Sequence, residues 1–256
     1  MGRCRLCLVL ISVAVLGLLV VESALADTAN SPNWTGYVAH RHGVRFTRVL
    51  GQWKQPRATC KPGTPRFSSM WVGLGGYRQG SNRLEQIGTE LDCTATGATS
   101  SSAWFELVPA GPQPIPIAVS PGDVMTASVA IVGHRVTMTL IDRTTRRSFR
   151  KTLRTSLLDV SSAEWIVEAP SNCIGGSACQ PEPLANFGSA RFVHARAWSS
   201  TGRRGTIADP AWHFTKVELA PTGMIVDYRP VGPLLNQVKT SGLAARGSAF
   251  GVGFSS

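Results

Sequence analysis

The stretch Ala163-Glu164-Trp165-Ile166-Val167-Glu168-Ala169-Pro170 combines bulky, β-favouring side chains at its centre with two glutamates. Side chains alternate between the two faces of a strand, so Glu164, Ile166 and Glu168 share one face of the predicted strand. A carboxylate on a buried sheet face is costly, so we expect both glutamates to face solvent, a partner or a substrate groove. The stretch therefore predicts a strand with one polar, accessible face.

The rest of the chain after residue 26 contains short β-type runs separated by Gly, Pro, Ser and Asn, with no long segment of helical period. This pattern predicts an all-β fold, a two-sheet antiparallel β-sandwich of the concanavalin-like or lectin-like jelly-roll type. The expected strands are Trp34–Ala39, Phe46–Lys54, Ser69–Leu74, Leu84–Leu91, Ala103–Val108, Asp123–Val132, Arg135–Ile141, Ser148–Leu153, Glu164–Glu168, Ala190–Ala195, Phe214–Leu219, Met224–Tyr228 and Ala249–Phe254.

Residues 1–26 resemble an export signal, with a basic start, an apolar run from Leu6 to Val21 and the small-x-small pattern Ala24-Leu25-Ala26. The apolar run is shorter than the roughly 20 residues that span a membrane. We therefore expect a secreted protein with no membrane segment once the signal is removed. Residues 27–256 are expected to form one domain, because no linker-like stretch divides them.

Four cysteines remain after the signal, which is an even number in an oxidising compartment. They allow three pairings, of which we favour Cys60–Cys93 as a long tie and Cys173–Cys179 as a local loop clasp. A zinc site is disfavoured because there is no Cys-x-x-Cys pair and the histidines lack ligand spacing. No metal site is predicted.

The formal net charge is +11, and most of the cations are arginines. Such a surface could adhere to nucleic acid, an anionic cell-wall polymer or an acidic protein. The densest basic run lacks the interleaved aromatic residues of a base-stacking platform, and a turn near Thr144-Thr145 makes it the solvated face of a hairpin. We therefore expect nonspecific adhesion to anionic polymers at most, and no specific nucleic acid partner. The run consists of Arg143, Arg146, Arg147, Arg150, Lys151 and Arg154.

Alternation in three other predicted strands places chemically useful residues on common faces. Trp71 shares a face with Gly73, Gln86 shares one with Glu90, and Trp104 shares one with Glu106. If these strands pair with the strand that ends at Glu168, one sheet face collects aromatic side chains, carboxylates and an amide. That composition is typical of a binding groove. The expected set is Trp71, Gln86, Glu90, Trp104, Glu106, Glu164 and Glu168.

Seven short motifs occur in the order found in the glutamic peptidases, the eqolisin family, and the chain resembles the bacterial branch of that family. The resemblance runs from about Asn33 to Phe192. The motifs are Asn33-Trp34-Thr35-Gly36-Tyr37, Val49-Leu50-Gly51-Gln52-Trp53, Met70-Trp71-Val72-Gly73-Leu74-Gly75-Gly76, Glu85-Gln86-Ile87-Gly88-Thr89-Glu90, Ala103-Trp104-Phe105-Glu106, Pro121-Gly122-Asp123 and Ala163-Glu164-Trp165-Ile166-Val167-Glu168.

The resemblance implies a sandwich of two seven-stranded sheets and an endopeptidase with a Gln86/Glu168 dyad. Glu168 would act as general base and then acid on a water molecule, and Gln86 would stabilise the oxyanion. This chemistry requires neither a metal nor another cofactor. Protein or peptide substrates would contact Trp71, Trp104, Glu106 and Glu164, and we expect a monomer.

One position departs from the family pattern. Many fungal members carry an aspartate where this chain has Gly75. A carboxylate there would raise the pKa of Glu168 by repulsion, and its absence bears on the acidic optimum typical of the family. We expect activity at acidic to mildly acidic pH.

Two alternatives remain open at the level of sequence. A jelly-roll glycoside hydrolase also carries glutamates on a concave strand, but Glu164 and Glu168 would stand about 13 Å apart along one strand, beyond the separation of a glycosidase pair. Glu168 with a cross-strand Glu106 could still be close enough. A non-catalytic lectin-like binding module is the second alternative.

Overall fold

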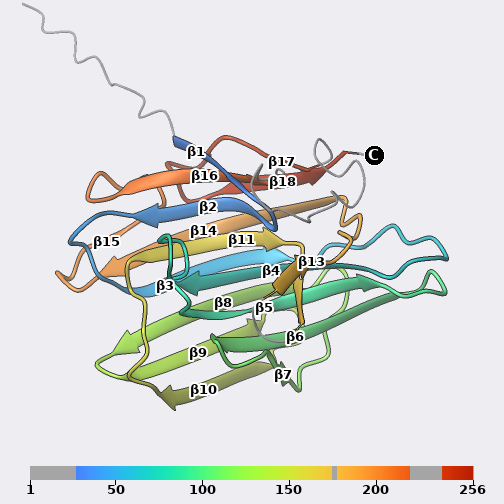
Figure 1. The fold of residues 1–256 in the computed structure, drawn as a ribbon, viewed down its shortest axis with the longest axis horizontal. Helices are drawn as coiled ribbons and strands as arrows, with labels where there is room; N and C mark the ends of the chain where they lie inside the picture. The colour runs from blue at the N-terminus through green and yellow to red at the C-terminus, as the bar shows by residue number, and fades with distance from the viewer. Residues whose placement is uncertain (1–26, 175–177, 220–237, 256) are drawn as a thin grey trace, which may run out of the picture.

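The computed structural model describes residues 27–174, 178–219 and 238–255. Within these ranges the regular elements are strands, which form two large stacked sheets and a small hairpin (Figure 1). The predicted β-sandwich is therefore confirmed. The described part contains no helix that is long and apolar enough to cross a membrane. The predicted export signal and the predicted strand Met224–Tyr228 lie outside the described residues.

The front sheet, as we name it, has eight strands in the order β1-β16-β2-β11-β4-β5-β6-β7. Neighbouring strands are antiparallel except β1, which pairs with β16 in parallel. Strand β11, which contains Glu164 and Glu168, lies near the centre of this sheet (Figure 1). The bounds are β1 Asp27–Ser31, β2 Trp34–His40, β4 Arg66–Leu74, β5 Leu84–Cys93, β6 Thr99–Val108, β7 Gln113–Ile115, β11 Ser162–Glu168 and β16 His213–Leu219.

The back sheet has seven strands in the order β10-β9-β8-β3-β14-β18-β17, and β15 pairs with β14 as an eighth. The resemblance implied seven strands in each sheet, and each has eight. Short strands such as β1, β7, β15 and β17 lack the long alternating runs that identify a strand in sequence. The bounds are β3 Phe46–Lys54, β8 Val124–Val132, β9 Arg135–Asp142, β10 Ser148–Arg154, β14 Ser189–Ser199, β15 Arg204–Gly205, β17 Val238–Thr240 and β18 Phe250–Phe254.

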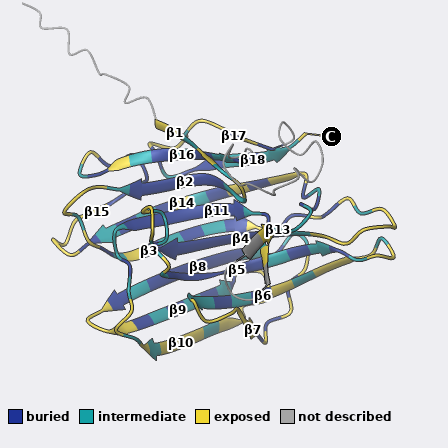
Figure 2. Ribbon diagram, viewed as in Figure 1, coloured by how far each residue is buried: buried dark blue, intermediate teal, exposed yellow. Residues whose placement is uncertain are grey.

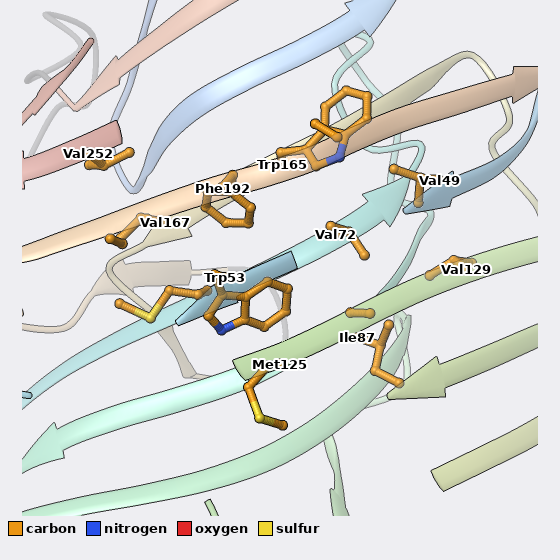
Figure 3. Packing of buried hydrophobic residues seen from close by; sticks show 14 of the residues in the cluster. Val49, Trp53, Val72, Ile87, Met125, Val129, Trp165, Val167, Phe192 and Val252 are labelled. Atoms are coloured by element: carbon orange, nitrogen blue, oxygen red, sulfur yellow. The ribbon is translucent and has the colours of Figure 1, made fainter. Parts of the chain in front are cut away.

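The main hydrophobic core fills the space between the two sheets (Figure 3). It forms because each strand turns alternate apolar residues inward, as β8 does with Met125 and Val129. Trp165 from the front sheet and Trp53 from the back sheet are both buried there, and each indole N–H finds an acceptor. Because Trp165 points inward, Glu164 and Glu168 on the same strand must point outward.

Two connections at one end of the sandwich are tied together. The β3–β4 loop and the turn of the β5–β6 hairpin lie side by side there (Figure 1), joined by the Cys60–Cys93 disulfide and a backbone bond from Gly63 N to Ala95 O. This disulfide is the long tie favoured from sequence. The small hairpin of β12 (Ser171–Ile174) and β13 (Ala178–Pro181) places Cys173 opposite Cys179, but their side chains lie outside the described part of the chain.

The hairpin predicted around Thr144-Thr145 joins β9 to β10. Asp142 closes its turn by accepting the backbone N–H groups of Thr144 and Thr145. Strand β10 forms the edge of the back sheet and exposes most of its residues (Figure 2). The prediction of a solvated, basic hairpin face is therefore confirmed.

Candidate active site

Strands β11, β4, β5 and β6 bring the predicted site residues onto the outer face of the front sheet. Residues paired across antiparallel strands point to the same face, so the register defines three rows of side chains on this face. All seven residues expected on a common face lie in these rows. The rows are Glu164, Gly73, Gln86 and Glu106; Ile166, Trp71, Gly88 and Trp104; and Glu168, Ser69, Glu90 and Ser102.

Glu168 ends β11 and is held by two N–H donors. Asn33 Nδ2 donates to Glu168 Oε1 at 2.8 Å, and Trp71 Nε1 donates to Glu168 Oε2 at 2.7 Å. These bonds favour the ionised carboxylate, but desolvation outweighs them and raises the pKa of Glu168 to about 8. The carboxyl group is thus fixed in orientation, and its pKa lies close to neutrality, which is suitable for accepting and returning a proton.

Gln86, in the middle of β5, is only 5% exposed. Its Nε2 donates to Glu106 Oε2 at 2.6 Å, which orients the amide. Its Oε1 is buried and has no hydrogen-bond partner among the described residues. Burial raises the pKa of Glu106, and the bond from Gln86 opposes that rise. Gln86 therefore keeps one N–H and its carbonyl oxygen available for another molecule.

Gln86 and Glu168 lie two strands and two rows apart on the outer face. Trp71, which donates to Glu168, lies one strand and one row closer to Gln86 than Glu168 does. Gly88 adds no side chain to the region between them, and a Cβ there would meet Met70 O at 2.3 Å. The charge of Glu106, which binds Gln86, contributes to the raised pKa of Glu168. The two predicted dyad residues therefore share an electrostatic neighbour in Glu106, which accepts from Gln86 and adds to the pKa shift of Glu168.

A small apolar cluster on the outer face supports these polar groups. It contains the buried residues Val38, Trp71, Leu84, Ile166 and Val217. Trp34 packs edge-on against Trp71 with ring centroids 5.0 Å apart. Trp71 is fully buried, so it holds Glu168 from the protein side of the site. Trp104 and Glu106 are partly exposed. A direct substrate contact by Trp71 stays a prediction.

Glu164 is the main departure from the sequence analysis. It lies on the predicted face, but it is fully buried, so the expectation that it faces solvent, a partner or a groove is wrong. Trp71 and Leu84 close over Gly73, the residue opposite Glu164. Neither carboxyl oxygen has a hydrogen-bond partner within the described ranges, and desolvation raises the pKa of Glu164 well above its usual value. A substrate contact by Glu164 stays a prediction that requires its cover to move.

A second buried carboxyl group, Glu85, points to the inner side of β5, and neither of its oxygens has a hydrogen-bond partner in the part of the chain that the structure describes. Burial raises its pKa to about 8, and repulsion from Asp159 adds to the shift. Burial also acts on Asp159, but hydrogen bonds from Ser161, Ser81 and Gly76 outweigh it and hold the pKa of Asp159 below its usual value. The carboxyl groups of this cluster therefore shift in opposite directions, with the pKa of Asp159 lowered and those of Glu85 and Glu164 raised.

Asp159 also accounts for the glycine at position 75. Gly75 has a φ of +85°, and a Cβ there would meet Asp159 O at 2.4 Å and Asp159 Cβ at 2.6 Å. The loop before β11 therefore places a carboxylate beside position 75, directly after the end of β4. The raised pKa of Glu168 arises mainly from its own burial.

Three residues that shape the site were not assigned by the sequence analysis. Asn33 lies in the first recognised motif, but its bond to Glu168 joins residues far apart in the chain. Glu85 adjoins Gln86 and was not considered because it faces inward. Asp159 lies in a loop without a motif. Within the described ranges, no group of three or more His, Cys, Asp or Glu side chains is placed to hold a metal ion.

The model of the Peptidase A4 family matches residues 32–225. The chain belongs to this family. It is a glutamic-type peptidase, as the motifs indicated, and the family membership favours this activity over the glycosidase and lectin alternatives. No curated protein matches the chain.

Solved glutamic peptidases share the fold of this peptidase. Scytalido-glutamic peptidase with a peptide-based transition state analog is 21% identical with a TM-score of 0.70, covering 88% of this chain and 98% of its own. SCP-B, an eqolisin solved with the tripeptide Ala-Ile-His, is 21% identical with a TM-score of 0.66, covering 88% and 98%. Aspergilloglutamic peptidase from Aspergillus niger is 25% identical with a TM-score of 0.55, covering 74% and 99%.

Proposed function

We propose that this peptidase is a secreted endopeptidase that uses a Gln86/Glu168 dyad. The observation that carries the proposal is the state of Glu168, a carboxyl group oriented by two N–H donors with a pKa raised to about 8. The unpartnered carbonyl oxygen of Gln86 supports it, because a buried acceptor without a partner is the group expected to bind a water or a substrate N–H.

In the proposed reaction, ionised Glu168 takes a proton from a water molecule as the water oxygen attacks the peptide carbonyl carbon. The carbonyl oxygen gains the negative charge, which the free N–H of Gln86 stabilises. The tetrahedral intermediate then collapses, the C–N bond breaks, and Glu168 returns its proton to the departing nitrogen. Glu168 ends the cycle ionised, so one carboxylate serves as base and then as acid.

Peptide substrates are proposed to lie over the outer face of the front sheet. The eqolisin SCP-B has been solved with a tripeptide, and the shared fold supports the same class of ligand here. Trp104 and Glu106 are the best placed of the predicted contact residues, because both are partly exposed and stand beside Gln86. Glu106 would also fix the amide of Gln86.

We propose a mildly acidic optimum, between two opposing limits. The base step needs ionised Glu168, whose fraction falls about tenfold per pH unit below its pKa, so strong acid lowers the rate. The fold loses stability as pH rises, because Glu85 and Glu164 are neutral in the folded state and ionise readily in the unfolded chain. Activity is therefore expected to peak on the acid side of neutrality, where part of Glu168 is ionised and the fold keeps the stability that Glu85 and Glu164 contribute.

Secretion is proposed from the export-like segment 1–26 and from the disulfide between Cys60 and Cys93. Disulfides form and persist in oxidising compartments and are rare in the cytosol.

The test is hydrolysis of casein by the purified protein and its variants at several pH values. Glu168→Gln keeps the shape of the side chain but removes the base, and Gln86→Ala removes the oxyanion donor. Both should lower kcat/KM at least 100-fold. Matched controls are Glu182→Gln, in a loop, and Gln52→Ala, on the back sheet, which should keep near wild-type rates. Cleavage that survives Glu168→Gln or Gln86→Ala would place the active site elsewhere.

A further inference from the structure

The outer face of the back sheet is strongly basic, and it lies on the opposite side of the sandwich from the candidate active site. The register of the sheet identifies its outward side chains, which alternate with the core residues of each strand. None of these outward residues on the described strands is Asp or Glu. The outward cations are Arg48, Lys54, Arg135, Arg150, Arg154, Arg191, Arg196, Arg204 and Lys239.

The front sheet has the opposite character. The outward residues of β11, β4, β5 and β6 include five carboxyl groups and no Lys or Arg. The formal charge of +11 is therefore unevenly distributed over the two faces. A uniform excess of arginine would serve solubility alone, whereas this separation creates one face with a positive potential.

Like charges meet on this face without compensation. Arg135 and Arg154 are directly opposite each other on β9 and β10. Cross-strand like charges destabilise a sheet. The ion pairs of the described residues are Arg203–Asp209 and Lys216–Glu218, so neither arginine is neutralised within the described chain. A bound anionic group would relieve this repulsion.

The chemistry between the cations favours an anionic polysaccharide. Thr137, Thr139 and Thr152 lie among the arginines. The hydroxyls of Thr137 and Thr152 bond to each other at 3.0 Å, which leaves one proton of that pair and the hydroxyl of Thr139 for hydrogen bonds to acidic or sugar oxygens. Trp198 is the aromatic residue among the outward side chains of the described back-sheet strands, and its ring is contacted by Arg48 at 4.8 Å and by Arg204 at 5.2 Å. Because the ring is thus occupied, the face has no free platform for stacking nucleic acid bases.

We propose that the outer face of the back sheet binds an anionic polysaccharide. Binding there would leave the front sheet free, so the peptidase could be retained on a polymer surface while it cleaves peptides. The inference is independent of the roles assigned to Gln86 and Glu168.

The test compares dextran sulfate, neutral dextran and a short DNA duplex as probes for the whole purified protein over a range of salt concentrations. The face variant carries Arg135→Gln, Arg150→Gln and Arg154→Gln. The matched control loses the same charge elsewhere, at the exposed loop and strand-end positions Arg57→Gln, Arg66→Gln and Arg78→Gln.

Wild type and control should bind dextran sulfate and not dextran. The face variant should bind at least tenfold more weakly, with a slope of log K against log salt smaller by about three. All three proteins should keep the same activity on a short peptide. The single variants Arg150→Gln, on the face, and Arg66→Gln, its control, repeat the comparison with less risk to folding. Arg150→Gln should reduce the slope of log K against log salt by about one.

Three results would overturn the proposal. Equal weakening in the face variant and the control would show an effect of net charge alone. A complete lack of binding to dextran sulfate would remove the site. Binding of the DNA duplex as tightly as dextran sulfate would identify a surface that recognises charge without preferring a polysaccharide.

Discussion

Replacing Trp71 by phenylalanine separates the chemical role of its indole N–H from its role in packing. That N–H donates to Glu168 Oε2 at 2.7 Å, and Trp71 is fully buried. A hydrogen bond to a charged group contributes about 1.5–3 kcal/mol, and one pKa unit corresponds to about 1.4 kcal/mol. Removing the bond should therefore raise the pKa of Glu168 by about one to two units, because the ionised form loses a donor.

The consequence for catalysis follows from the direction of this shift. A base with a higher pKa is less ionised at a given acidic pH, so kcat/KM of Trp71→Phe at mildly acidic pH should fall about 10- to 100-fold. The acid limb of the pH profile should move upward by the same one to two units. The measurement is kcat/KM on a fluorogenic peptide from about pH 5 to 11, a range that brackets the pKa of Glu168 before and after the substitution.

The control is Trp53→Phe in the main core. Trp53 is also buried, and its Nε1 donates to Thr89 Oγ1 at 3.0 Å, so the same groups are lost away from Glu168. This variant should lose stability and keep the wild-type pH profile. If Trp71→Phe lowers kcat/KM equally at every pH, with its acid limb unmoved, the indole acts only through packing and the reasoning about Glu168 fails.

Other predictions concern stability. Glu85→Gln should stabilise the fold at pH 8, by at most about 5 kcal/mol, and change little at pH 4. Between these pH values Glu85 keeps its proton in the folded state, where its pKa is raised to about 8, but loses it in the unfolded chain, so the wild type loses stability as pH rises. Urea unfolding at both pH values tests this, and a gain at pH 4 as large as at pH 8, or a similar gain in Glu182→Gln, would contradict it. Gly75→Ala should lower the Tm by more than about 4 °C, since both its φ of +85° and the contact with Asp159 oppose a Cβ. Gly80→Ala, with a φ of +78° and open space, should cost less, and equal losses would rule out the contact. Cys60→Ser opens a disulfide with a sequence separation of 33 and should cost about 3–4 kcal/mol in unfolding by urea; an unchanged midpoint would argue against its role.

The sequence predicted the long central strands well, and the reason is visible in β3 and β11. Both combine large apolar residues that face inward with polar residues that face outward, and β3 has the predicted bounds, Phe46–Lys54. The face of each site residue also followed from alternation. Short edge strands such as β7 at Gln113–Ile115 could not be predicted in this way, because three residues do not establish a period.

Burial on the outer face could not be predicted from one strand. Alternation places Glu164 outward. Trp71 and Leu84, from two other strands, close over the neighbouring Gly73, and Glu164 is thereby buried. The partners of the site were equally hidden, since Asp159 reaches Gly75 from a loop far along the chain. Such contacts depend on tertiary packing, which local pattern does not encode.

The position of Asn33 has a practical consequence for producing the enzyme. Asn33-Trp34-Thr35 fits the acceptor sequence for N-linked glycans, and the same side-chain nitrogen that a glycan would modify holds Glu168. A glycan attached to Asn33 would crowd the Glu168 carboxylate and disturb its orientation. We expect protein made in a glycosylating host to fold but to cleave peptides more slowly than protein of the same sequence made in bacteria.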